Sequence, residues 1–192
     1  MALIILISNF SNEYEKILTV LGITAASFVY SQGRIIVNNY SKYDFHGFLI
    51  TTNSTTGCYP RAGNSGAIVI PAECHMGNGL ALVYEGYRDQ FISSLYPTTN
   101  WEVTVNPLTS SIMAWDDVNL APVSTIATTT KWYATKFDMT EPGTNISVQD
   151  FHTNLNIANP CSPGIMDYYV TPSGNNSAEM FTIGSITYLQ LF

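Results

Sequence analysis

The residues that could bind a metal are few and lie far apart along the chain. Three histidines and three cysteines have the side chains that most often bind zinc: His46, His75, His152, Cys58, Cys74 and Cys161. They show no short zinc-site spacing, and Cys74 and His75 are adjacent, so on a strand they would point to opposite faces. A zinc site of Cys58, Cys74, His75 and His46 could form only through folding, and we predict that the protein binds no metal.

Two motifs could do catalytic chemistry. The segment Gly63-Asn-Ser-Gly66 is similar to the nucleophile loop of trypsin-like proteases, but those enzymes place the serine after their histidine and aspartate, whereas Ser65 comes early. Asp116 and Asp117 could serve a glycosidase only if two carboxyl groups faced each other across a cleft, which neighbours in sequence do not indicate. We therefore predict a Gly-rich turn and a solvated turn, no catalytic residue, no enzyme and no cofactor.

The composition is that of a folded domain with little charge. Apolar residues make up 46% of the 192 residues, which is enough for a core and excludes an intrinsically disordered chain. Seven Lys and Arg against fourteen Asp and Glu give a net charge of −7. Because nucleic-acid binding needs a dense basic patch, we expect no nucleic-acid partner.

The cysteine count and the first residues give two further expectations. An odd number of cysteines allows at most one disulfide, so we predict buried or idle thiols rather than a disulfide framework. Residues 1–8 are apolar but short, lack a basic flank and lead directly to Asn12 and Glu13. This pattern predicts a buried strand at 3–7 and synthesis without a cleaved signal peptide. It leaves the compartment open, with release from the cell among the alternatives.

One amphipathic helix is expected near the N-terminus, at residues 13–21. Asn12 can cap it, Glu15 stands in capping-box spacing and Gly22 supplies the stop. After it come short apolar runs, separated by turns rich in Gly, Pro and Asn, which predict strands. The expected strands cover residues 28–30, 34–37, 45–51, 66–70, 79–84, 101–106, 131–138, 167–170 and 180–192.

Many short strands without alternating helices predict an all-β fold, an antiparallel β-sandwich or barrel with one short N-terminal helix. The jelly roll is one sandwich with enough strands. Residues 101–106 alternate, with Trp101, Val103 and Val105 on one face. The final run, 181–191, is long enough for a central strand. Since no linker or repeat interrupts the chain, we expect one domain at 1–192.

Aromatic residues near turns are the candidate contact residues. The predicted ligand-binding set adjoins expected turns: Tyr84, Tyr87, Tyr96, Trp132 and Tyr133. Tyrosine and tryptophan beside loops are typical of glycan, lipid-headgroup and protein contacts, because the ring is apolar and its edge is polar. The alternative is that these side chains belong to the core, in which case Trp132→Ala would destabilise the fold instead of weakening binding.

Several segments together resemble a known family. They are residues 15–21, Arg34-Ile-Ile-Val-Asn38, Ser65-Gly-Ala-Ile-Val-Ile-Pro71, residues 77–89, Lys131-Trp-Tyr-Ala-Thr-Lys-Phe137 and Ser185-Ile-Thr-Tyr-Leu-Gln-Leu191. Their order is similar to that of the actinoporin-like pore-forming proteins, and fungal fruit-body lectins have a related sandwich. The resemblance spans roughly residues 12–192. It implies an actinoporin-like sandwich and a lipid-headgroup loop near 121–130, where Trp132 and Tyr133 are the nearest aromatics.

Two functions of different classes follow. The first is a non-enzymatic β-sandwich that binds membrane lipid or glycan as a lectin or a pore-forming toxin. The second is a self-assembling structural subunit, such as a viral capsid or sheath protein, because obligate contacts are apolar and poor in charge. In both cases we expect a homo-oligomer.

Overall fold

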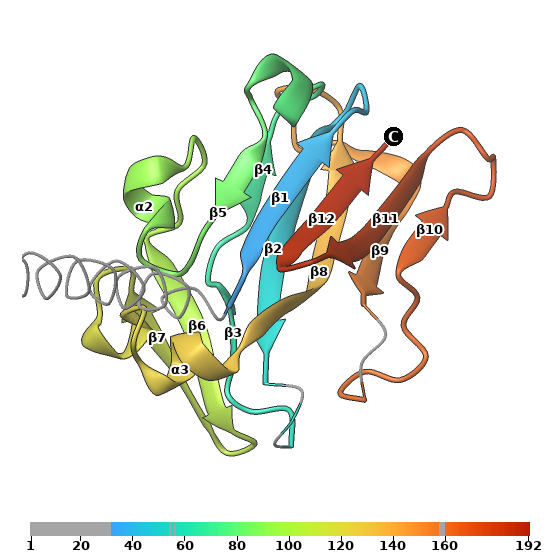
Figure 1. Ribbon diagram of the computed structural model, residues 1–192. Coiled ribbons are helices and arrows are strands. Elements are labelled where there is room, and N and C mark those ends of the chain that lie inside the picture. Colours follow the sequence, from blue (N-terminus) through green and yellow to red (C-terminus); the bar gives the residue numbers. More distant parts are fainter. Residues whose placement is uncertain (1–31, 54, 56, 158–159) are drawn as a thin grey trace, which may run out of the picture. The chain divides into compact units, whose positions relative to one another are not determined.

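The computed structural model describes residues 32–192 except 54, 56, 158 and 159. These residues form two β-sheets, named sheet A and sheet B, which Figure 1 shows as two layers. The predicted β-rich class is therefore confirmed. The predicted strands at 3–7 and 28–30 and the helix at 13–21 lie outside the described residues.

Sheet A has the strand order β10-β11-β12-β1-β5. Its strands are β1 (Arg34–Asn39), β5 (Leu82–Tyr84), β10 (Tyr168–Val170), β11 (Ser177–Ile183) and β12 (Ile186–Leu191). All five overlap expected strands: β1, β5 and β10 overlap 34–37, 79–84 and 167–170, and β11 and β12 both overlap 180–192. In β12 buried side chains alternate with partly exposed ones.

Sheet B has the order β7-β6-β3-β2-β8-β9, and β4 also pairs with β2. Its strands are β2 (Asp44–Thr52), β3 (Arg61–Asn64), β4 (Ile68–Ile70), β6 (Asn100–Asn106), β7 (Thr109–Ala114), β8 (Lys131–Thr140) and β9 (Ser147–Asn156). Short helical turns connect them: η1 (Met76–Asn78), α2 (Gln90–Ser93), η2 (Val118–Leu120) and α3 (Thr125–Thr129).

The expectation of a wholly antiparallel fold is wrong at one place. β1 and β12 pair in parallel, with Arg34 opposite Ile186 and Asn39 opposite Leu191. Parallel neighbours need a long connection between them, and here most of the chain lies between the two strands. Every other strand pair in the described residues is antiparallel.

The expected single strand at 180–192 is instead a hairpin. β11 ends at Ile183 and β12 begins at Ile186, with Ile183 directly opposite Ile186. Gly184 has φ +62°, a left-handed conformation that suits a two-residue turn and that glycine adopts readily. The second half, β12, does lie inside the sheet, between β11 and β1.

Side chains from both sheets form one hydrophobic core. Sheet A contributes Ile35, Val37, Leu189 and Leu191, and sheet B contributes Phe45, Leu49, Phe137 and Trp101. At one end of this core the rings of Tyr84, Tyr87, Trp101 and Trp132 lie with centroids between 4.9 and 6.2 Å apart. Such edge and tilted contacts add to the energy of burial.

Candidate functional site

Four of the five predicted contact residues are buried in the core. The exposed fractions of their side chains are 0% for Tyr84, 1% for Tyr87, 3% for Trp132 and 6% for Tyr133. The Trp132 indole donates a hydrogen bond to the Gly33 carbonyl at 3.0 Å. These four residues pack the interior of the protein, and a ligand on its surface would not reach their rings.

Their polar edges are also used internally. The Tyr87 hydroxyl lies 2.5 Å from the Thr51 hydroxyl and 2.7 Å from that of Thr130, and burial raises the pKa of Tyr87 to about 12. The Tyr84 hydroxyl donates to the Tyr96 carbonyl, and burial raises the pKa of Tyr84 as well. Nearness to a turn in sequence suggested exposure, but Tyr84 lies in β5 and Trp132 and Tyr133 lie in β8, where their side chains are buried.

Tyr96 is the predicted contact residue that stays partly exposed. Its hydroxyl donates to the Leu80 carbonyl at 2.9 Å, and it lines a shallow depression with residues 65–69 and 97–99. Solvent or a ligand could therefore reach part of the Tyr96 side chain, whereas the other four predicted residues are buried.

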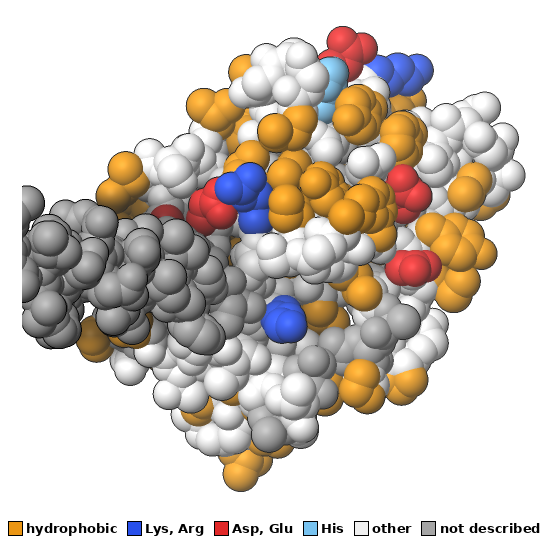
Figure 2. Space-filling model, in the orientation of Figure 1, with side chains coloured by type: hydrophobic (Ala, Val, Ile, Leu, Met, Phe, Trp, Pro, Cys, Tyr) orange, Lys and Arg blue, Asp and Glu red, His pale blue; other side chains and the backbone are white. Residues whose placement is uncertain are grey.

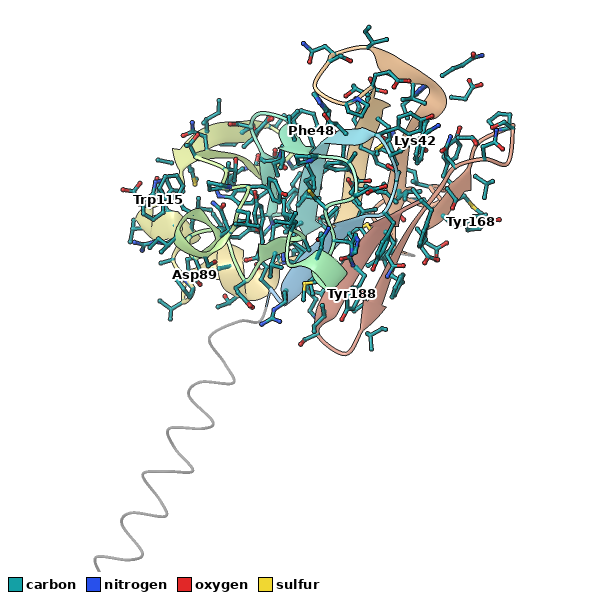
Figure 3. The ribbon with its side chains drawn as sticks, turned by 90° about the horizontal axis from the view of Figure 1, so that it is seen from above. Lys42, Phe48, Asp89, Trp115, Tyr168 and Tyr188 are labelled. Atoms are coloured by element: carbon teal, nitrogen blue, oxygen red, sulfur yellow. A yellow bond between two sulfur atoms is a disulfide. The ribbon has the colours of Figure 1, made fainter. Side chains whose placement is uncertain are left out.

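Two hollows lined by several charged side chains lie on sheet B, on the face turned away from the core. In β2 the side chains of Phe45 and Leu49 are buried, whereas His46, Phe48 and Ile50 alternate with them and are partly exposed. We call this face of sheet B the outer face. In Figure 3, Phe48 of sheet B and Tyr188 of sheet A lie on opposite sides of the two layers.

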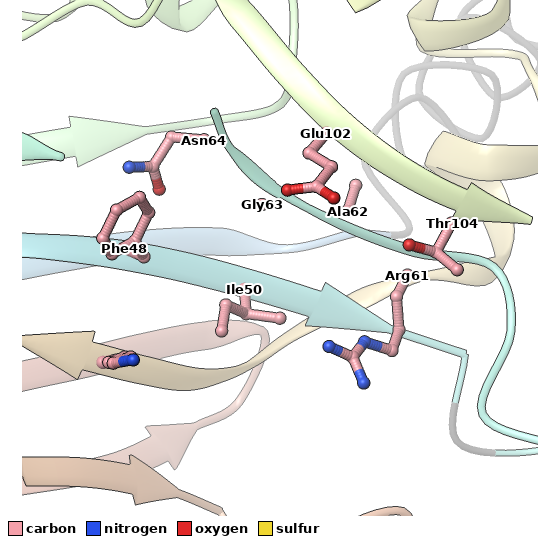
Figure 4. Close-up of a pocket in the computed structure, with 9 residues that line it drawn as sticks. Phe48, Ile50, Arg61, Ala62, Gly63, Asn64, Glu102 and Thr104 are labelled. Atoms are coloured by element: carbon pink, nitrogen blue, oxygen red, sulfur yellow. The ribbon is translucent and has the colours of Figure 1, made fainter. Parts of the chain in front are cut away.

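The first hollow is centred on a glycine in β3. Gly63 stands between Ile50 of β2 and Glu102 of β6 in the register of the sheet, and it has no side chain to fill the space between them. The hollow has a volume of about 170 Å³ and is shown in Figure 4. It is lined by Phe48, Ile50, Arg61, Ala62, Gly63, Asn64, Glu102, Thr104 and Lys136.

Asn64 has a structural role in this hollow. Its Oδ1 accepts a hydrogen bond from the Leu49 amide at 2.7 Å, and its Nδ2 donates to the carbonyls of Gly47 and Gly66. Because these bonds satisfy the buried side chain, Asn64 holds β3 beside β2. The polar groups left to meet a ligand come from Arg61, Glu102, Thr104 and Lys136.

The second hollow lies beside the first, over β2, β8 and β9. Its volume is about 550 Å³, and it is lined by His46, Phe48, Lys136, Phe137, Asp138, Ser147, His152, Thr153 and Asn154. Phe48 and Lys136 line both hollows and stand directly opposite each other in the register of β2 and β8. They therefore form the boundary between the two.

A row of three titratable residues crosses the second hollow. His46 is opposite Asp138, and Asp138 is opposite His152, on three adjacent strands. Residues opposite each other in antiparallel strands point to the same face. Asp138 Oδ2 accepts a hydrogen bond from the Ser147 hydroxyl, whereas Asp138 Oδ1 is buried and has no hydrogen-bond partner in the described part of the chain.

The two hollows differ in charge from the rest of the protein. The two hollows contain the cations of Arg61 and Lys136 and the carboxylates of Glu102 and Asp138, which cancel. The whole chain has a net charge of −7, so this negative charge lies elsewhere. An approaching anion therefore meets less repulsion here than over the remaining surface.

A disulfide lies next to the first hollow, and it contradicts the prediction of three unpaired thiols. Cys58 and Cys161 are bonded, with their Cα atoms 5.5 Å apart, while Cys74 is free and buried. Cys58 precedes the first residue of β3, Arg61, by one short turn. The sequence could not show this pairing, because folding brings together loops that are 103 residues apart.

Three of the candidate catalytic and metal residues take part in structural hydrogen bonds. Asp117 caps η2 by accepting a hydrogen bond from the Asn119 amide at 2.8 Å, and the Ser65 amide donates to the Asn100 carbonyl. His75 accepts a hydrogen bond from the Gly77 amide and caps η1. Across 32–192, without the four undescribed positions, no three His, Cys, Asp or Glu side chains are placed to hold a metal ion.

The predicted Gly-rich turn is partly a strand, because the first two residues of Gly63-Asn-Ser-Gly66 are the last two of β3. Arg61–Asn64 forms β3 and pairs with both β2 and β6. Glycine and asparagine weaken the local strand pattern, and neighbouring strands on both sides supply the hydrogen bonds that compensate. The residue that opens the first hollow was therefore hidden in a segment predicted as a turn.

Among the described residues, no helix is both long and apolar enough to cross a membrane. Comparison of the chain with protein-family models, with curated proteins and with solved structures gives no match.

Proposed function

We propose that the two sheets pack as a β-sandwich of the jelly-roll or actinoporin-like kind, and that the protein is a non-enzymatic glycan-binding protein. The ligand lies on the outer face of sheet B, across the first and second hollows. The observation that carries this proposal is the Phe48 ring at the boundary of two adjoining hollows, with hydrogen-bonding side chains on both sides.

A sugar suits this arrangement because it has two kinds of surface. Its C–H face packs on an aromatic ring, and its hydroxyl groups exchange hydrogen bonds with side chains at the edge. Phe48 offers the ring, Glu102 accepts hydrogen bonds, and Arg61 and Lys136 donate them. A bilayer surface instead favours a continuous apolar patch with basic residues around it, so glycan is preferred to membrane lipid as the partner.

The proposal is tested by filling the first hollow. A Cβ added at Gly63 meets the Leu49 carbonyl oxygen at 3.4 Å and Ile50 Cγ1 at 3.5 Å, which are ordinary contacts. Gly63→Val should therefore fold, while its side chain occupies space that the ligand needs. We expect the wild-type protein to bind oligosaccharides on a printed array and Gly63→Val to lose about tenfold or more of that affinity.

Gly66→Val is the matched control, because a Cβ there meets no atom within 4 Å and Gly66 lines neither hollow. It should bind as the wild type does. The proposal is contradicted if no glycan binds, or if both variants bind equally well. Leakage from neutral phosphatidylcholine vesicles in the absence of glycan binding would assign the partner to membrane lipid instead.

Assembly into a homo-oligomer is a second candidate function, favoured by the outer face of sheet A. Phe181, Tyr188 and Val83, which are half-buried, stand in one row with the buried Ile36 across four strands, and the Phe181 and Tyr188 rings stack with centroids 5.3 Å apart. Figure 2 shows hydrophobic side chains gathered over β1 and β12. Obligate contacts between copies have this apolar, charge-poor character.

The partner in this case is a second copy of the chain, and a single charge should prevent its docking. Ile183 lies two residues from Phe181 on the same face and is 64% exposed, so Ile183→Asp should convert an assembly into monomers on size exclusion with light scattering. Ile146→Asp is the control, since Ile146 is 66% exposed but lies beside sheet B. A wild-type monomer at micromolar concentration would rule out this function.

A further inference from the structure

We infer that the glycan bound on the outer face of sheet B carries a carboxylate, and that Lys136 is the residue that recognises it. This inference rests on the proposed function and names the class of sugar. It comes from the way in which the four charged groups of the two hollows are paired.

Each of the two carboxylates accepts one hydrogen bond from a hydroxyl group of the chain, although Asp138 Oδ1 has no partner among the described residues. Glu102 Oε1 accepts a hydrogen bond from the Ser110 hydroxyl at 3.2 Å, and Asp138 Oδ2 accepts one from the Ser147 hydroxyl. These hydroxyl donors occupy acceptor sites that the cations nearby could have used.

The cations do not have such partners. Neither Arg61 nor Lys136 forms an ion pair with any residue that the structure describes, whereas Arg34 on sheet A is paired with Glu85. Both side chains are exposed and line the first hollow. On a chain with seven Lys and Arg, two unpaired cations in one hollow leave donor capacity that an anionic ligand group would satisfy.

Lys136 is the better placed of the two. It lines both hollows and stands opposite Phe48 on β2 and opposite Asn154 on β9. A sugar ring packed on Phe48 would therefore hold a carboxylate on its edge against the Lys136 ammonium, with the Asn154 amide beside it. In the second hollow His46 and His152 add polar groups, and the carboxylate there is that of Asp138, two residues from Lys136 along β8.

The experiment compares matched sugars by isothermal titration calorimetry. 3′-Sialyllactose is paired with lactose, and tetragalacturonate with cellotetraose, each against the wild type, Lys136→Gln, Lys136→Arg and Lys131→Gln. Lys131 is the control, because it is an exposed lysine at the start of the same strand and lines neither hollow.

We expect at least one acidic sugar to bind about ten- to hundredfold more tightly than its neutral partner, the range for a hydrogen bond to a charged group. Lys136→Gln should remove that preference, while Lys136→Arg and Lys131→Gln keep it. The preference should also weaken from 50 to 500 mM NaCl, since the side chain is exposed and salt screens its charge.

The possible outcomes distinguish this inference from the proposed function on which it rests. If neutral sugars bind as tightly as acidic ones, or if Lys136→Gln keeps the preference, the inference is wrong and glycan binding stands. Binding of sulfated sugars alone also overturns it, because the anion is then not a carboxylate. If no sugar of any kind binds, the proposed function fails together with the inference.

Discussion

Cys58 and Cys161, which are 103 residues apart, are joined by a disulfide that ties the loop before β3 to the loop after β9. The bond closes a long loop, so it removes much conformational freedom from the unfolded chain. We expect the Cys58→Ala, Cys161→Ala double variant to lose about 2–5 kcal/mol of the free energy of unfolding, measured by urea denaturation.

Thiol counting provides the control for this prediction. The denatured wild-type protein should react with one equivalent of a thiol reagent before reduction and three after it, because Cys74 alone is free. Three reactive thiols without reduction would contradict the pairing. Equal unfolding midpoints for the oxidised and reduced wild type would show that the disulfide contributes nothing to stability.

Trp132→Ala should act on folding rather than on ligand binding. The Trp132 ring is buried against Tyr84, Tyr87 and Trp101, so its removal leaves a cavity in the core and costs about 3–5 kcal/mol. Trp115→Ala is the comparison, since Trp115 is only half-buried and should cost less. Chemical denaturation of both variants tests this, and a Trp132→Ala protein of wild-type stability that fails to bind glycan would contradict it.

Stability should fall at alkaline pH because of Tyr87. In the folded protein burial raises the pKa of Tyr87 to about 12, compared with 10.0 for an exposed tyrosine. Below about pH 10 Tyr87 is neutral in both the folded and the unfolded chain, so the free energy of unfolding is not reduced. Between pH 10 and 12 the unfolded chain ionises first, and the free energy of unfolding falls by about 3 kcal/mol.

Tyr87→Phe checks this assignment. The variant loses hydrogen bonds to Thr51 and Thr130 and should be less stable at neutral pH, but its stability should decline less steeply between pH 10 and 12. Urea midpoints measured at several pH values for both proteins give the two slopes. Parallel slopes would mean that Tyr87 does not account for the alkaline loss.

Gly47→Ala should destabilise the protein although only one methyl group is added. A Cβ at Gly47 would lie 2.2 Å from the Phe45 ring, which packs in the core beside Phe137. Overpacking of this kind costs about 1–3 kcal/mol. Gly66→Ala, where the new methyl group meets nothing, should be nearly neutral in the same thermal unfolding experiment.

The strand runs were predictable where side chains alternate clearly. In β6, Trp101 and Val103 are fully buried as their spacing predicts, although Val105 is exposed near the end of the strand. β9 was missed because its exposed side chains are polar, and β3 because Gly63 and Asn64 are typical of turns. In both strands pairing with neighbours outweighs local propensity.

The candidate site depends on register, which a single sequence does not contain. His46, Asp138 and His152 come from three strands and share a row only because β8 pairs with both β2 and β9. The alternation of residues 45–51 did hold a usable signal, since it places His46, Phe48 and Ile50 on the face opposite to Phe45 and Leu49. The aromatic residues near turns were a misleading signal for the site, because four of the five are buried in the core.

The parallel pairing of β1 with β12 also has a consequence for synthesis. β1 emerges from the ribosome about 150 residues before its neighbour β12 does. At about 5–20 residues per second, one edge of β1 waits for about 7–30 s with its amide and carbonyl groups unpaired. An open strand edge can recruit another chain. A second nascent chain on a neighbouring ribosome can therefore pair with this edge of β1 before β12 is made. We expect chaperones that cover the open edge to raise the yield of folded protein.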